Sequence, residues 1–181
     1  MRIPDWTPEA QAQSPELLQT ILARRGGALL NLDKALLWSG PVAQGWHAFF
    51  QHVRADLTVP RKLSELGICT VALLTGADYE YHHHAPDFLK AGGTAAELSA
   101  LQLAIAHQPS QGVSQDGLGP LAQLVVQYAA QMTLQIAVDE DLFRALQAHL
   151  NSTQLVELTT VIAAYNMVAR ILLTLQITPE E

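Results

Sequence analysis

Three residues of one short stretch, Glu65, Glu80 and His84, carry side chains that can accept and donate protons. Glu80 and His84 are four residues apart, so they would share a face of a helix, and Glu80 could also meet His83. A carboxylate beside an imidazole suits general acid–base catalysis near neutral pH. If Glu65 lies on a neighbouring antiparallel helix, two carboxylates and one or two imidazoles would converge on one partly buried point.

A helical hairpin would bring Glu65 to the other two residues. The segment 66–77 is a nearly uncharged apolar run, long enough for a helix and apolar on more than one side, which predicts a buried helix. A turn at 75–78 then leads into a second helix that carries the histidine cluster. Pro86 lies inside this second helix and cannot donate to the carbonyl of His82, so we expect a kink just after the cluster.

The sequence of the rest of the chain predicts further helices joined by short connections. Capping residues, first-turn prolines and apolar spacing predict helices at about 14–25, 33–37, 42–55, 60–74, 78–90, 95–106, 120–137, 139–150 and, capped by Ser152, 153–176. No segment alternates as a strand would, which predicts an all-α helical bundle with a loop at 108–119. We expect one domain overall, with an N-terminal arm and first helix at 1–30 and a helical domain at 31–181.

The composition excludes several kinds of partner. The net charge is -7 with no basic stripe, which argues against nucleic acid. No apolar run reaches the roughly 18–20 residues of a membrane span. The single cysteine, Cys69, excludes an intrachain disulfide, and the N-terminus has no apolar signal core, so we expect a cytoplasmic protein. Only 15% of residues are charged, against about 25% in typical domains, which indicates a self-association interface.

The spacing of the candidate residues resembles that of a known superfamily. Glu65-(x11)-Ala77-x-x-Glu80-x-x-x-His84 is similar to the pattern of carboxymuconolactone decarboxylases and alkyl hydroperoxidase D-like proteins. The hydroperoxidase branch has cysteines at the positions of Ala77 and Glu80. The sequence LTGADYEYHHHAP at 74–86 resembles instead a cysteine-free branch that reads approximately LTGAEYEW-x-x-HVP.

The resemblance covers roughly residues 30–178 and includes the C-terminal motif YNMVAR at 165–170. It implies an all-α helical bundle of the alkyl hydroperoxidase D-like type with a central helical hairpin. It also implies a homo-oligomer, a dimer, trimer or hexamer, with the site near a subunit interface.

Thiol peroxidase activity does not follow from this resemblance. Such an enzyme needs a reactive thiolate and a partner thiol, and neither Ala77 nor Glu80 provides one. Cys69 lies inside the apolar run, where burial would raise its pKa and make it inert.

The decarboxylase branch implies a lyase that needs no thiol and no cofactor and acts on a small carboxylated or lactone-like substrate, as in aromatic degradation. His84 would be the acid–base residue, with Glu65 and Glu80 orienting or charging it. An anionic substrate would need a cation, which Arg61 or Arg170 could supply. The candidate substrate-binding residues are Tyr79, Tyr81, His83 and Arg170.

Several alternatives stay open at this point. Glu80-x-x-His83 has the form of a di-iron ligand pair, but the chain has no second such pair, and a mononuclear site from His82, His84 and a carboxylate is the other possibility; we predict no metal. Glu80 and His84 could also form only a surface pair. The chain could equally be a peroxiredoxin-like family member that has lost its thiols, or a non-catalytic oligomer that binds a small ligand.

Two other histidines, His47 and His52, lie on the helix predicted at 42–55. Their simplest interpretation is a surface histidine or one satisfied by a helix cap, and we assign them no function from the sequence.

Overall fold

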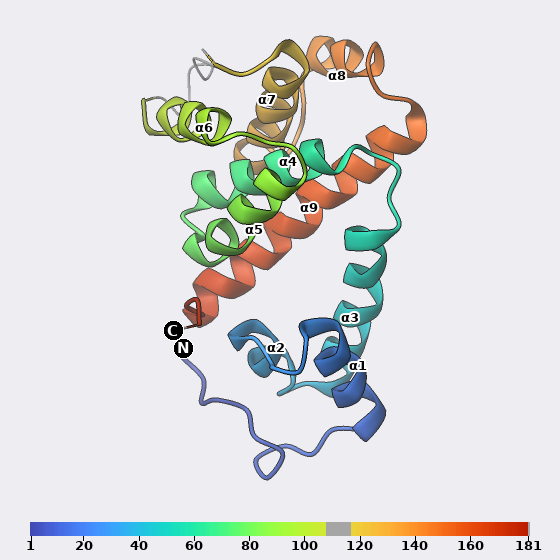
Figure 1. Cartoon of the computed structure of the whole chain (residues 1–181), viewed down its shortest axis with the longest axis vertical. Helices are drawn as coiled ribbons and strands as arrows, with labels where there is room; N and C mark the ends of the chain where they lie inside the picture. The colour runs from blue at the N-terminus through green and yellow to red at the C-terminus, as the bar shows by residue number, and fades with distance from the viewer. Residues whose placement is uncertain (108–116, 181) are drawn as a thin grey trace. The chain divides into compact units, whose positions relative to one another are not determined.

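The computed structural model describes residues 1–107 and 117–180, and these residues form α-helices and no strand (Figure 1). The helices are α1 (Pro15–Arg25), α2 (Asn31–Leu36), α3 (Gly40–Ala55), α4 (Arg61–Thr75), α5 (Asp78–Lys90), α6 (Ala95–His107), α7 (Pro120–Leu134), α8 (Glu140–Gln147) and α9 (Ser152–Leu175). The all-α prediction is confirmed. Most of the loop predicted at 108–119 lies outside the described residues.

The chain divides into two compact units, each described here by itself. The first comprises Met1–Asp56 with Ile171–Glu181, and the second comprises Leu57–Arg170. The boundary that we place after residue 30 from the sequence stays a prediction.

In the first unit, α1 begins and ends where its capping residues predict. The Ser14 hydroxyl accepts a hydrogen bond from the backbone N–H of Leu17, and Gly26 ends the helix with a left-handed φ of 72°. Arg25 at the end of α1 forms an ion pair of 2.7 Å with buried Asp33 of α2. This pair joins the two helices.

In the second unit, α4 and α5 form the predicted hairpin, and α4 also packs against α7 (Figure 1). Residues 63–72 of α4 are all buried, including the polar side chains of Ser64, Glu65 and Thr70. Gly76 adopts φ 72° at the turn between the helices, a conformation that favours glycine. Glu157 holds the segment just before α4, because its carboxylate accepts a hydrogen bond of 2.7 Å from the backbone N–H of Val59.

Several predicted helix ends differ from the structure, among them the end of α8 at Gln147 rather than at residue 150. We expected the helix that starts at residue 120 to continue to 137, but α7 ends at Leu134 because Ile136 has φ 71° and leaves the right-handed helical conformation. The cap of α9 is Asn151 rather than Ser152. The Asn151 side chain accepts a hydrogen bond from the backbone N–H of Gln154, and the Gln154 side chain accepts one from the backbone N–H of Asn151.

The longest helix, α9, is long and apolar enough to cross a membrane by length and composition alone. No uninterrupted apolar run marks this helix in the sequence, because threonines and an asparagine are spread along it. Half of its most apolar window is buried within the fold, as in the core helix of a soluble protein.

Replacing Gly93 with alanine is expected to destabilise the hairpin. A Cβ atom at Gly93 would overlap the ring of fully buried Phe88, which has no room to move, so the free energy of unfolding should fall by about 1–3 kcal/mol. Gly45→Ala is the control, because an added Cβ there meets nothing within 4 Å on a helix, and it should stabilise by about 0.5–1 kcal/mol. Urea unfolding compares the two, and equal effects would contradict the expected overlap.

Candidate active site

The hairpin brings Glu65 of α4 into contact with His84 of α5. Glu65 Oε2 and His84 Nδ1 are 2.7 Å apart. The Glu65 side chain is 1% exposed and the His84 side chain 12% exposed, so the contact is largely shielded from water but reachable from the surface. The antiparallel hairpin inferred from the spacing therefore places these two side chains together.

This hydrogen bond determines which nitrogen of His84 is available for chemistry. An ionised carboxylate only accepts hydrogen bonds, so the proton of neutral His84 lies on Nδ1 and points to Glu65. The other nitrogen, Nε2, keeps its lone pair and can accept a proton. Glu65 also stabilises the imidazolium that would form, as a carboxylate does in other carboxylate–histidine pairs.

Arg61 adds a cation to this pair. Its Nε and Nη2 both lie 2.6 Å from Glu65 Oε1, four residues further along α4. The Arg61 side chain is 47% exposed, and its Nη2 is 3.9 Å from the carboxylate of Asp87. The cluster of Arg61, Glu65, His84 and Asp87 thus presents a positive group to solvent beside the buried Glu65–His84 pair.

Glu80 lies one helical turn before His84 but does not pair with it. It is 2% exposed, and neither of its carboxylate oxygens has a hydrogen-bond partner within the described residues. Burial raises the pKa of Glu80 from 4.5 to about 9, so this carboxyl group is neutral at pH 7. The alternative of a Glu80–His84 surface pair is wrong, because Glu80 is buried and neither of its oxygens pairs with His84.

Cys69 is fully buried, and burial, followed by the nearby carboxylates of Glu65, Glu80 and Asp87, raises the pKa of its thiol far above the usual range. This confirms the expectation that Cys69 is not a reactive thiolate.

The predicted substrate-binding residues have different surroundings. The buried Tyr79 ring contacts the ring of His83, with centroids 4.6 Å apart. Burial raises the pKa of Tyr81, which is partly exposed. Arg170 donates to the backbone oxygen of Asn166 at 2.7 Å, so within the described residues its hydrogen bonds stay on α9.

The structure adds one aromatic residue that we did not select from the sequence. The ring of buried Tyr165 on α9 meets the ring of His84 edge to face, with centroids 4.7 Å apart. In the sequence, only the motif YNMVAR, which contains Tyr165, could have indicated that this residue lies at the site. Local spacing could not connect it to His84, because the two are far apart in the chain.

Ligand atoms of Glu65, His84 and Asp87 lie within 4.8 Å of one another, and one imidazole with two carboxylates could hold a divalent ion. A metal there would compete with Arg61, whose guanidinium already binds Glu65. The mononuclear set considered from the sequence differs, because His82 is exposed and does not belong to this group.

Comparison with known proteins agrees with this fold. Residues 40–108 match the carboxymuconolactone decarboxylase family, a segment that contains both Glu65 and His84. No curated protein matches the chain.

Two solved structures share the fold. A protein from Ralstonia eutropha JMP134, described as an alkylhydroperoxidase AhpD core and an uncharacterized peroxidase-related protein, has a TM-score of 0.80 at 14% identity, covering 99% of this chain and 92% of its own. An uncharacterized peroxidase-related protein from Silicibacter sp. TM1040 has a TM-score of 0.74 at 16% identity, covering 92% of this chain and 86% of its own. At these identities the likeness establishes the fold. The family match covers residues 40–108, and the likeness in fold extends over most of the chain.

Proposed function

We propose that this protein is a cofactor-free acid–base catalyst that decarboxylates, or transfers a proton on, a small carboxylated or lactone-like molecule. The observation that carries the proposal is the 2.7 Å hydrogen bond between Glu65 and His84 Nδ1, which leaves Nε2 as the proton-accepting atom. The match of residues 40–108 to the carboxymuconolactone decarboxylase family supports the same class of reaction.

The residues of the cluster have complementary roles in this proposal. Arg61, whose side chain is half exposed, would attract the substrate carboxylate. Loss of CO2 breaks a carbon–carbon bond and leaves its electron pair on the carbon beside the lactone carbonyl. The Nε2 lone pair of His84 would first take up a proton from water, His84 would give that proton to the carbon, and Nε2 would then take up another from water. Neutral Glu80 would be a second proton donor one turn away.

Redox chemistry by thiols is not part of the proposal. Cys69 is the only cysteine in the sequence and it is buried with a raised pKa, so the chain offers no thiolate pair for peroxide reduction. The peroxidase-related description of the two structural relatives is therefore not transferred to this chain.

A homo-oligomer in the cytoplasm belongs to the same proposal. The low content of charged residues, 15%, and several large exposed apolar side chains support self-association. These exposed side chains include Leu103, Leu134, Ile136 and Val156.

A substrate panel tests the reaction class. We expect release of CO2 from carboxymuconolactone or a related carboxylated lactone, unaffected by a metal chelator and unchanged in Cys69→Ala. Peroxide reduction with a dithiol should be no faster than the uncatalysed reaction. Failure to release CO2 or exchange protons with any carboxylated or lactone compound would contradict the proposal. Loss of turnover on chelation would replace the proposed mechanism with a metal-dependent one at Glu65, His84 and Asp87.

A further inference from the structure

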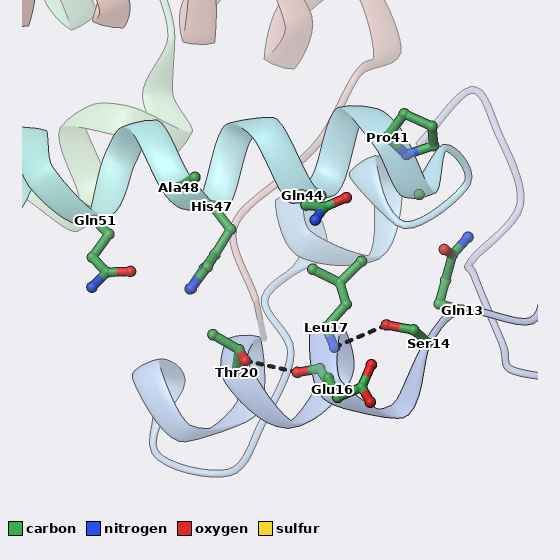
Figure 2. A pocket seen from close by; sticks show the side chains of 11 residues that line it. Gln13, Ser14, Glu16, Leu17, Thr20, Pro41, Gln44, His47, Ala48 and Gln51 are labelled. Carbon is green, nitrogen blue, oxygen red and sulfur yellow. Dashed lines mark hydrogen bonds between the residues drawn. The ribbon is translucent and has the colours of Figure 1, made fainter.

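A cavity of about 490 Å³ lies between α1 and α3 in the first unit, and none of the residues that line it belongs to the proposed active site (Figure 2). Figure 2 shows His47 and Gln51 of α3 pointing toward α1, where Thr20 faces them, with Gln44 one turn before. The volume is in the range of small-molecule sites in proteins.

His47 is the most buried polar group of this cavity. It is 8% exposed, and its Nδ1 has no hydrogen-bond partner within the described part of the chain. Burial, and then the positive charge of Arg24, lower the pKa of His47, so its imidazole is neutral at pH 7. The expectation of a surface or cap-satisfied histidine is wrong for His47, although it holds for exposed His52, which pairs with Asp56 at 2.6 Å.

The described residues that line the cavity favour an uncharged ligand. They include three glutamine carboxamides and two hydroxyl groups, which can both donate and accept hydrogen bonds. Their only charged group is the exposed Glu16, and no lysine or arginine is among them, so an anion would find no partner. Leu17 and Ala48 add apolar surface for the C–H groups of a ligand.

We propose that the cavity between α1 and α3 binds a small uncharged polyol or monosaccharide, held by hydrogen bonds from His47, Gln51 and Thr20. A neutral imidazole presents one donor and one acceptor, and a carboxamide presents an NH2 donor and an oxygen acceptor. The Thr20 hydroxyl donates to the backbone oxygen of Glu16 at 2.7 Å and can accept from a ligand, so the set as a whole matches the hydroxyl groups of a polyol. The site is separate from the proposed catalysis and does not depend on it.

Titration of the full-length protein with myo-inositol and glucose tests this site. The Cε1–H resonance of His47, identified among the seven histidines by its loss in His47→Gln, should shift and saturate. Gln51→Leu and Thr20→Val should each weaken binding about three- to tenfold, as expected for the loss of one neutral hydrogen bond. Gln102→Leu is the matched control, because it makes the same change at an exposed position of α6 and should leave binding unchanged.

Four results would overturn the proposal. The first is the absence of a saturable shift with either compound in the folded wild-type protein. The second is equal binding by wild type, Gln51→Leu and Thr20→Val. The third is stronger binding of acetate or methylammonium than of the polyols. If a second copy of the chain fills the cavity, the His47 resonance will shift with protein concentration and not with polyol, which also contradicts the proposal.

Discussion

Replacing His84 with glutamine is expected to lower kcat about 10²–10⁴-fold on the substrate that the panel identifies, with little change in KM. Glutamine keeps a polar group near Glu65 but has no nitrogen that takes up and releases a proton near neutral pH. The Nε2 lone pair, which the Glu65–Nδ1 hydrogen bond leaves available, is the group that the substitution removes. Steady-state kinetics beside a thermal unfolding curve separates lost chemistry from lost folding.

His82→Gln is the matched control for this experiment. It makes the same change two residues away on α5, at an exposed histidine outside the Glu65–His84 contact, and should leave kcat unchanged. Glu65→Gln provides a second readout, because removing the carboxylate that orients the imidazole and stabilises the imidazolium should also lower kcat in a folded protein. Full turnover by folded His84→Gln would contradict the proposed role of His84.

The sequence was sufficient to predict the hairpin because its signals are local. The apolar run at 66–77 can be shielded from water only if the helix that contains it is buried. The helix break at 75–78 then leaves two short helices that pack antiparallel. Their lengths then determine which residues meet. This is why Glu65 and His84, 19 positions apart, could be expected to lie together.

The orientation of single side chains could not be predicted in the same way. Glu80 and His84 share a helix face by spacing, yet only His84 reaches Glu65, while Glu80 is buried with no hydrogen-bond partner in the described part of the chain. That difference depends on how far α5 is rotated against α4, which neighbouring helices determine. The same holds for Tyr165, whose contact with His84 joins distant parts of the chain.

The cation beside His84 is Arg61, and the sequence contains a signal for its ion pair with Glu65. Arg61 and Glu65 are four residues apart on one helix, a spacing that favours an ion pair, and the structure contains that pair. Arg170, selected for the same purpose, is also four residues from a partner, and its hydrogen bonds go to Asn166. Spacing indicated both local pairs, but only tertiary structure distinguishes which one lies beside His84.

Replacing Glu80 with glutamine is expected to stabilise the protein at neutral and alkaline pH. The pKa of Glu80 is raised in the folded protein from 4.5 to about 9, so folding requires its carboxyl group to hold a proton that the unfolded chain releases above pH 4.5. The contribution of Glu80 to stability is therefore fully present below pH 4.5 and is lost as the pH rises to about 9. Glutamine has the same shape, stays neutral and avoids this loss.

The expected gain is about 1–3 kcal/mol in the free energy of unfolding at pH 7, since each pH unit between the two pKa values corresponds to at most about 1.4 kcal/mol. Urea unfolding at pH 5 and pH 8 measures it, and the difference between Glu80→Gln and wild type should be larger at pH 8. Glu9→Gln is the control, because Glu9 is exposed and its substitution should give the same small difference at both pH values. A pH-independent difference for Glu80→Gln would contradict the neutral, buried state of Glu80.

The same variant decides whether that buried acid serves the reaction. A glutamine amide cannot supply a proton, so if Glu80 is the second donor, the stabilised Glu80→Gln protein should lose turnover while its Glu65–His84 pair stays intact. A gain in stability together with a loss of activity is the pattern expected where a protein maintains a costly buried group for its function. A gain in stability with full activity would instead assign proton delivery to His84 alone. Glu80 would then only fill space in the core and have no role in the reaction.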